Sequence, residues 1–227
     1  MKFFIFLLIV ILSVFDLHSQ QKPVHKPVHT IIVPKPTPPQ AWIGVFAGPN
    51  LNYLDYYDQL TTIEGKNISF HAGLFYQKKI SKYFALQPAL IFSVRGGKIR
   101  DVDSTINARL MNIELPANFL YFYKHIMIGA GPNFTYGIKG KLKSDEMERN
   151  AYNADESLER TLKRFQLGGN FLIGYTFKKG IFITINFSPG FTNIYKGDGS
   201  APGNIRAGTR VIGLSVGYLF DVTNNSY

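Results

Sequence analysis

The sequence contains no cysteine, and its charged residues amount to 18%, against about a quarter in typical soluble domains. Without cysteine the chain can form neither a disulfide framework nor a thiolate metal site. Beyond residue 15 it also lacks any run of 18 uninterrupted apolar residues, which excludes a bundle of membrane-spanning helices. A membrane location would therefore require a closed β-barrel, because lipid cannot satisfy the backbone groups of an open sheet edge.

What the sequence does contain is eight segments rich in aromatic and aliphatic residues between 42 and 220. Long polar stretches and short turns join these segments alternately. The long stretches span 53–67, 100–108, 142–162 and 196–205, and the short turns span 81–83, 122–124 and 178–180. An even number of antiparallel strands with short turns at one rim and long loops at the other is typical of outer-membrane β-barrels.

The segment 109–121 shows the two-residue alternation that strands require. One face carries Met111, Ile113, Leu115, Ala117, Phe119 and Tyr121, and the other carries Leu110, Asn112, Glu114, Pro116, Asn118 and Leu120. In a soluble lipocalin-like barrel the apolar face points inward. Across the segments the more polar face is rich in small residues and nearly uncharged, which suits a crowded lumen better than a solvated exterior. We therefore expect the apolar face to contact lipid.

These patterns predict an all-β fold: an eight-stranded antiparallel up-and-down transmembrane β-barrel over 41–221, followed by a short tail at 222–227. Residues 1–19 have the charge, the apolar run and the small residue before Gln20 that indicate a signal peptide. Residues 20–40 hold six of the twelve prolines, which predicts an extended periplasmic linker. Both chain ends are then expected in the periplasm, and the long loops outside the cell.

Six inward positions are candidates for polar groups or an ion pair in the lumen: Arg95, Asn112, Glu114, Asn118, Asn170 and Asn186. Closing the 100–108 loop places Arg95 opposite Asn112, with Glu114 as a diagonal neighbour. An Arg95–Glu114 pair is expected because a charge in a narrow lumen is costly unless it is paired. Such a pair either plugs the lumen or lines a solute path, and eight strands leave an interior that side chains can fill.

A short repeat occurs in the first and fifth predicted strands. Gly48-Pro49-Asn50 in the first returns as Gly131-Pro132-Asn133 in the fifth. Proline lacks the amide hydrogen that a strand ladder needs. Both copies are therefore predicted to mark bulges that bend the barrel wall before the loops begin.

The sequence offers little support for catalysis. His71 and His125 fall in predicted strands, but neither has a neighbouring serine and carboxylate in an evident relay. No catalytic residue, cofactor or metal is therefore assigned. The net charge of +10 gathers beside the predicted short turns, for example at Lys78, Lys82 and Lys178. This placement favours contact with anionic lipid headgroups over binding of nucleic acid.

Six motifs occur in a familiar order along the chain. They are Trp-Ile-Gly-Val-Phe-Ala-Gly-Pro-Asn-Leu-Asn at 42–52, Ala-Gly-Leu-Phe-Tyr at 72–76, Ala-Leu-Gln-Pro-Ala-Leu-Ile-Phe with Arg-Gly-Gly-Lys at 85–98, Asn-Ile-Glu-Leu-Pro at 112–116, Gly-Ala-Gly-Pro-Asn at 129–133 and Leu-Ser-Val-Gly-Tyr-Leu-Phe at 214–220. Together they resemble the PorT-type outer-membrane β-barrel family. The resemblance implies an eight-stranded barrel in the outer membrane, places Glu114 within a family motif, and supplies no catalytic residue. The name-giving member is associated with type IX protein secretion.

The sequence thus predicts a non-enzymatic outer-membrane barrel that acts through partners. The expected partners are outer-membrane lipid and lipopolysaccharide, together with secretion-system or periplasmic proteins that would bind residues 20–40. The most specific role is an accessory component of type IX secretion. Two alternatives stay open: a small-solute channel, and a surface ligand-binding or adhesion barrel that uses the 142–162 loop.

Overall fold

The computed structural model describes residues 40–56, 67–100, 105–143, 148–152, 162–194 and 207–223. The predicted signal peptide, the proline-rich segment up to residue 39 and residues 224–227 of the tail lie outside the described residues. Within the described part, no helix has the length and apolar character needed to cross a membrane.

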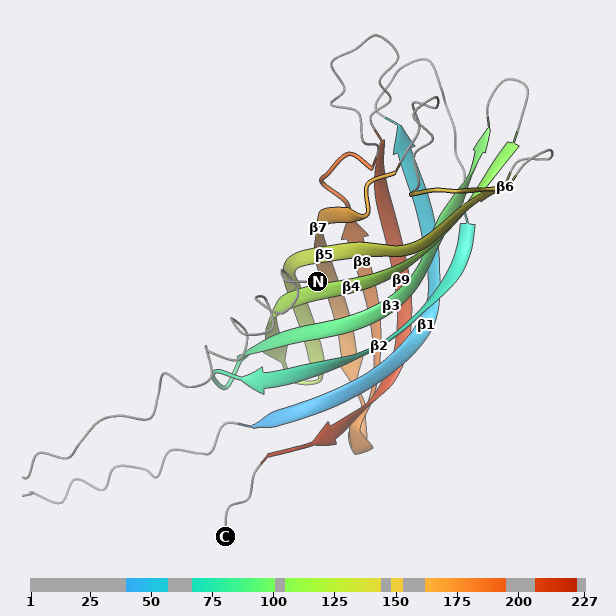
Figure 1. The fold of residues 1–227 in the computed structure, drawn as a ribbon. Coiled ribbons are helices and arrows are strands. Elements are labelled where there is room, and N and C mark those ends of the chain that lie inside the picture. The colour runs from blue at the N-terminus through green and yellow to red at the C-terminus, as the bar shows by residue number, and fades with distance from the viewer. Residues whose placement is uncertain are drawn as a thin grey trace, which may run out of the picture. The chain divides into compact units, whose positions relative to one another are not determined.

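The described residues form nine strands and one short 3₁₀ helix (Figure 1). Eight of the strands are long: β1 (Ala41–Tyr56), β2 (Asn67–Lys79), β3 (Phe84–Arg100), β4 (Thr105–Tyr123), β5 (Ile126–Lys143), β7 (Phe165–Thr176), β8 (Ile181–Pro189) and β9 (Ala207–Asp221). The short elements are β6 (Glu148–Asn150) and η1 (Lys178–Gly180).

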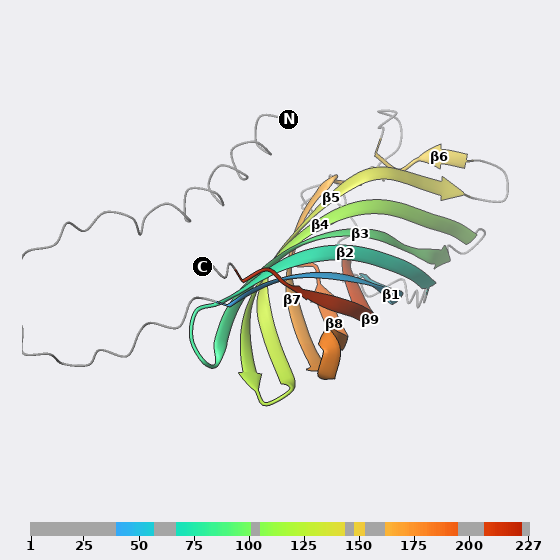
Figure 2. The ribbon, with the colours of Figure 1, turned by 90° about the horizontal axis from the view of Figure 1, so that it is seen from below.

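Each long strand pairs antiparallel with its neighbours along the chain, and β9 returns to pair with β1. The sheet is therefore closed, and the predicted eight-stranded antiparallel barrel is confirmed. Seen from below, β7, β8 and β9 lie across from the broad wall formed by β1 to β5 (Figure 2). Strand β6 stands outside this ring of eight and pairs with the last residues of β5.

The barrel has two unlike ends. At one end, here called the short-turn end, β2 joins β3 through 80–83, β4 joins β5 through Lys124 and His125, and β7 joins β8 through η1. The start of β1 and the end of β9 also meet at this end, where Trp42 pairs with Asp221. The opposite end, here called the loop end, is where the segments 57–66, 101–104, 153–161 and 195–206 connect the strands.

The side chains sort by face as the alternation predicts. Along β4, Leu110, Asn112, Glu114, Pro116, Asn118 and Leu120 are buried inside the barrel. The outer face carries exposed apolar side chains from all eight long strands, including Val45, Leu74, Leu90, Phe119, Ile128, Ile173, Ile185 and Val216. Aromatic rings pack against one another on this face, as between Phe84 and Phe119, whose centroids are 5.2 Å apart. Because the apolar groups are turned outward and the polar groups inward, the barrel presents a surface suited to lipid.

The register of β3 and β4 differs from the prediction. The ladder continues up to the Arg100–Thr105 pair, so that the connection is 101–104 rather than 100–108. Arg95 consequently lies opposite Leu110, and Asn112 lies opposite Ser93. The ends of this hairpin are rich in polar residues such as Lys98 and Asn107. The pairing there joins Lys98 with Asn107, Ile99 with Ile106 and Arg100 with Thr105, so each strand carries one apolar residue between polar ones.

The bulges predicted at the two Gly-Pro-Asn copies do not occur. The β1–β9 pairing keeps one offset across the first copy, from Ala47–Val216 to Asn50–Gly213, and the β4–β5 and β5–β7 pairings keep theirs across Gly131–Asn133. The register shift that does occur lies elsewhere, between Met111 and Asn112 of β4.

Both copies instead allow a neighbouring strand to approach closely. A Cβ atom placed on Gly48 would lie 1.7 Å from the carbonyl oxygen of Leu214, and one on Gly131 would lie 1.9 Å from that of Ala117. In each copy the next residue is a proline, which has no amide hydrogen to offer the adjacent strand. The carbonyl oxygen of that strand lies against the glycine Cα, where a side chain would otherwise be. The repeat therefore permits close packing of neighbouring strands without a change of register.

Candidate functional site

The barrel interior is arranged in three layers along its axis. A polar layer in the middle lies between an apolar cluster at the loop end and a second apolar cluster at the short-turn end. The lumen is the candidate functional site because it holds the buried charges of the described residues.

The loop-end cluster consists of Leu110, Ala151, Tyr152, Leu162 and Ile194, with Leu142 packed against it. Two of its residues, Ala151 and Tyr152, directly follow strand β6. The amide of Ala151 donates to the carbonyl of Gly140, and the amide of Leu162 donates to the carbonyl of Ala151, each at 3.0 Å. These bonds hold both ends of the loop between β5 and β7 inside the barrel mouth. The loop-end cluster therefore covers the polar layer.

Tyr152 is the largest side chain of this cluster. Its ring lies under the guanidinium of Arg164, 4.7 Å from the ring centroid, and its hydroxyl is buried with no hydrogen-bond partner among the described residues. Glycine makes room for it, since a Cβ atom on Gly137 would lie 2.1 Å from the Tyr152 hydroxyl. Burial raises the pKa of Tyr152 to about 12, and the charges of Arg164 and Arg95 oppose that rise.

The polar layer is centred on an ion pair between Arg95 of β3 and Glu114 of β4. Arg95 Nε donates to Glu114 Oε1 at 2.9 Å, and Nη2 donates to Oε2 at 2.5 Å. The Ser93 hydroxyl also donates to Oε1, and Asn133 Nδ2 donates to Oε2 at 2.9 Å. Both charged side chains are almost fully buried. Two parallel charge-assisted bonds and two further donors compensate the desolvation of the carboxylate.

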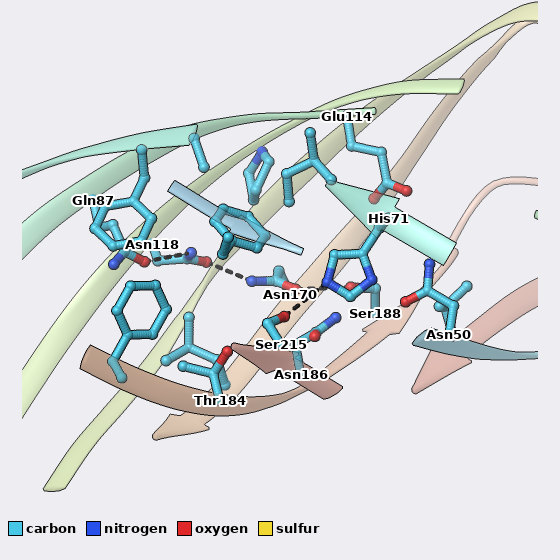
Figure 3. Close-up of a pocket in the computed structure, with 18 of the residues that line it drawn as sticks. Asn50, His71, Gln87, Glu114, Asn118, Asn170, Thr184, Asn186, Ser188 and Ser215 are labelled. Atoms are coloured by element: carbon cyan, nitrogen blue, oxygen red, sulfur yellow. Dashed lines mark hydrogen bonds between the residues drawn. The ribbon is translucent and has the colours of Figure 1, made fainter. Parts of the chain in front are cut away.

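A chain of amide groups continues the polar layer toward the other side of the barrel. Gln87 donates to Gln77 and Asn118 donates to Gln87, each at 3.3 Å, while Asn170 donates to Asn118 at 2.9 Å. The Ser188 hydroxyl donates to Asn170 at 2.7 Å. The residues come from β2, β3, β4, β7 and β8. Figure 3 shows the side chains of Gln87, Asn118, Asn170 and Ser188 in the lumen. The network ties five strands together through their inward side chains.

The short-turn cluster lies on the opposite side of the lumen, and the amide chain passes it at Gln77, which follows Phe75 on β2. It consists of Phe75, Ala89, Met127 and Phe182, with Phe46, Ile91, Phe122, Leu172 and Leu219 packed against it. The rings of Phe75 and Phe182 meet at 5.5 Å between centroids. Gly44 admits the Phe75 ring, since a Cβ atom there would lie 2.2 Å from it. Large apolar side chains therefore fill the lumen at this level.

Between the two clusters remains a cavity of about 50 Å³, which has room for a few water molecules. His71 and Ser215 line it, and His71 Nε2 lies 2.7 Å from Ser215 Oγ (Figure 3). His71 Nδ1 is buried and has no hydrogen-bond partner within the described parts of the chain. The cavity cannot accommodate an organic substrate beside this pair, and Glu114 is bound to Arg95 instead. The pair therefore lacks both the access and the third member that nucleophilic catalysis requires.

The six luminal candidates differ in the contacts that they make. It brings Arg95 to Glu114 and links Asn118 to Asn170. Asn112 is buried, and its Nδ2 donates to the carbonyl of Leu110 at 3.4 Å. Asn186 lines the central cavity. Among the described residues, no three His, Asp or Glu side chains gather where they could hold a metal ion.

Several members of the polar layer are not among the six sequence candidates: Ser93, Gln77, Gln87, Ser188 and the His71–Ser215 pair. The strand alternation already places Gln87, Ser93 and His71 on the inward face, but it does not single them out as site residues. Their partners could not be read from parity, because the bonds join strands whose registers depend on loop lengths. Asn133, predicted as part of a bulge, instead supports Glu114.

A closed eight-stranded barrel with an apolar outer face and a filled interior defines an outer-membrane β-barrel protein. A family model described as "Outer membrane protein beta-barrel domain" matches residues 19–196, and the chain belongs to this family. No curated protein matches the chain.

Several solved structures are similar to the chain. Neisserial surface protein A has a TM-score of 0.49 and 8% identity, with 79% of this chain and 97% of that chain covered. Ail of Yersinia pestis has a TM-score of 0.47 and 13% identity, with 80% and 99% covered. OprG of Pseudomonas aeruginosa has a TM-score of 0.47 and 11% identity, with 81% and 97% covered. These likenesses concern the barrel fold and carry no information about function.

Proposed function

We propose that this protein is a non-enzymatic, non-conducting outer-membrane barrel that acts by binding partners at its two ends. The observation that carries this proposal is the pair of apolar clusters that close the lumen on either side of the polar layer. A hydrated ion or a polar solute crossing the barrel would have to part both clusters. The desolvation of the solute and the loss of packing would both oppose that passage.

The polar layer supports the same proposal. The carboxylate of Glu114 is neutralised by Arg95 and accepts bonds from Ser93 and Asn133. A selectivity filter instead presents charged or carbonyl groups to the passing ion. The interior resembles a protein core with a satisfied polar network, which rigidifies a fold.

The proposed orientation places the short-turn end in the periplasm and the loop end outside the cell. It is supported by the general build of bacterial outer-membrane barrels, in which short turns face the periplasm and longer loops face outward. The residues before β1, including the proline-rich 20–39, then start from the periplasmic rim. They are proposed to bind periplasmic or secretion-system proteins, while the outer face binds outer-membrane lipid and lipopolysaccharide.

For a partner-binding barrel in this orientation, the most specific proposed role is an accessory component of type IX protein secretion. Its support is the resemblance of the ordered motifs over 42–220 to the PorT-type family. A matching experiment deletes the gene in its host and compares the secreted and surface proteomes with those of the wild type. Loss of a set of exported proteins, with their accumulation in the periplasm, is expected. An unchanged secretome would overturn the secretion role.

The closed lumen has its own test, which is the conductance of the purified protein in planar lipid bilayers. We expect no step-like currents from wild-type protein. Currents that scale with the amount of protein would favour the alternative function, a small-solute channel, and would overturn the proposal. The closed lumen and the secretion role can therefore be rejected independently of each other, the first by conductance and the second by the secretome.

The loop end supports a second candidate function, the binding of a ligand or surface at the cell exterior. Ala151 and Leu162 hold the two ends of the loop between β5 and β7 within the loop-end cluster. A loop whose two ends are held by a rigid scaffold is typical of binding sites. Replacing residues 153–161 with a short Gly-Ser linker should abolish surface binding without unfolding the barrel, and unchanged binding would reject this candidate.

A further inference from the structure

The short-turn end contains a large cavity that the proposed closure of the lumen does not use. Its volume is about 620 Å³, within the range of ligand-binding pockets. Phe122 and Leu219 line it and also pack against the short-turn cluster, and so they form its floor. We call this cavity the vestibule. It is open toward the short-turn end, and Gln77, at the end of the amide chain, also lines it.

The charged residues that line the vestibule are mainly cationic. Lys79 ends β2, Lys124 lies in the β4–β5 connection and Lys179 lies in η1, and Asp221 is the acidic side chain that accompanies them. Lys79 Nζ donates to Gln40 Oε1 at 3.1 Å and lies 5.2 Å from the ring centroid of Trp42. Within the described parts of the chain none of the three lysines forms a salt bridge. The vestibule is therefore suited to a ligand that carries negative charge.

Backbone geometry gives a second, independent sign at the same place. Among the described residues two that are not glycine have a positive φ, Lys124 at 56° and Lys179 at 72°. Glycine and asparagine are the residues that normally occupy such positions in turns. Lysine is unfavourable there because of its Cβ atom. Residues held in unfavourable conformations concentrate at functional sites, and both of these lysines line the vestibule.

We propose that the vestibule binds an acidic peptide segment of a partner protein, with carboxylates at the lysines and an apolar side chain on the Phe122–Leu219 floor. This proposal rests on the partner-binding function and names the chemistry of one partner. A peptide can enter along the barrel axis from the aqueous side. A membrane lipid would have to leave its leaflet and reach the vestibule past Tyr218 and Phe220, which line it and are exposed on the outer face.

The chain's own proline-rich segment is a poor occupant on grounds of charge. Residues 20–39 carry Lys22, Lys26 and Lys35 and contain no Asp or Glu. The lysines of the vestibule would repel this segment rather than bind it. The expected occupant is therefore a segment of another protein.

Trp42 makes the proposal directly measurable. It is the single tryptophan of the chain, and it lines the vestibule. The full-length barrel in lipid nanodiscs would be titrated at low salt with the tryptophan-free peptide acetyl-Asp-Glu-Phe-Glu-Asp-Leu-amide. The matched neutral probe is acetyl-Asn-Gln-Phe-Gln-Asn-Leu-amide. Tryptophan emission should change saturably with the acidic peptide and remain unchanged with the neutral one.

The variants are chosen so that folding is preserved. In Lys124→Asn/Lys179→Asn, asparagine suits the positive φ, and the charge is removed. We expect its affinity for the acidic peptide to fall about tenfold, from the loss of two exposed charge pairs. The control Lys82→Asn/Lys178→Asn removes the same charge from residues that do not line the vestibule, and its affinity should match the wild type. Migration of the unheated protein on SDS gels checks that each barrel is folded.

Three results would overturn the inference: no saturable response, an equal response to the neutral peptide, or an equal loss of affinity in the control variant. Complete displacement of the peptide by dihexanoyl-phosphatidylglycerol, at concentrations below its micelle point, would assign the vestibule to a lipid headgroup instead. A failure here leaves the closed lumen standing, because conductance tests that separately. Currents in planar bilayers would overturn the closed lumen whether or not the peptide binds.

Discussion

Arg95 binds Glu114 with two parallel hydrogen bonds, although the residue opposite Arg95 in the β3–β4 ladder is Leu110. The guanidinium therefore reaches along the barrel axis toward Ile91, which is the residue opposite Glu114. This diagonal pair is the centre of the polar layer. Five predictions follow from it and from the packing around it.

Glu114→Gln should destabilise the barrel by roughly 3–5 kcal/mol, because it leaves a buried guanidinium without its counter-charge. The double variant Arg95→Met/Glu114→Gln should recover most of that loss. The measurement is the free energy of unfolding in urea, in lipid vesicles. Equal stability of Glu114→Gln and the wild type would mean that the pair is not desolvated. Lys82→Gln at the short-turn rim serves as the surface control.

Phe182→Ala should lower the free energy of unfolding by roughly 3–5 kcal/mol, because it opens a void in the short-turn cluster. Its side chain is 1% exposed. Phe171→Ala, on the outer face, removes the same group where lipid can fill the space, and should cost less. If both substitutions had the same effect, Phe182 would not be part of a packed seal. The conductance of Phe182→Ala should remain zero because the loop-end cluster is intact.

Gly131→Ala should destabilise the barrel by about 1–3 kcal/mol, since its Cβ atom would overlap the carbonyl oxygen of Ala117 and force the strands apart. Gly48→Ala should destabilise the barrel in the same way, because its Cβ atom would overlap the carbonyl oxygen of Leu214. Gly169→Ala is the control, because its nearest neighbours are side-chain atoms at 3.0 Å or more. The measurement is the free energy of chemical unfolding of the three variants, compared under one condition. A bulge at Gly131 would instead leave room for alanine.

Tyr152→Phe should stabilise the loop-end cluster by roughly 1 kcal/mol, because it removes a buried hydroxyl that has no partner among the described residues. Limited proteolysis of the loop between β5 and β7 is the measurement, and the variant should be cut more slowly than the wild type. Faster cutting would show that the hydroxyl is satisfied, for instance by water.

The same tyrosine should make the loop sensitive to high pH. The pKa of Tyr152 is raised to about 12 in the folded protein from an ordinary value of 10.0. Its contribution to stability is therefore complete below pH 10 and is lost as the pH rises toward 12. Wild-type protein should become more open to proteolysis over this range, relative to Tyr152→Phe at the same pH.

The alternation of side chains was sufficient to predict the barrel. Along 109–121 every second residue is apolar, and the structure turns that face outward while Glu114 and Asn118 lie inside. The expected partnership of Arg95 and Glu114 followed from the cost of burying either charge alone. These predictions rest on local rules, since the strand period and the need to pair a buried charge hold whatever the loops do.

The register and the long-range contacts could not be predicted in the same way. The β3–β4 hairpin extends further than its apolar pattern, and the Gly-Pro-Asn copies permit close strand approach rather than bulges. Both outcomes depend on which backbone groups of the neighbouring strand lie opposite these residues. The sequence of one strand does not specify that alignment.

The sequence by itself determined the fold class, the strand number and which face of each strand lies inside, because these depend on a period of two along one segment. Only the tertiary structure decided that His71 meets Ser215 across 144 positions of the chain, and that two apolar clusters close the lumen. Lys79 of β2, Lys124 of the β4–β5 connection and Lys179 of η1 likewise line one vestibule. Such residues come together because the sheet closes between β1 and β9. How it closes depends on the register of every strand pair, and no single segment of the sequence fixes that.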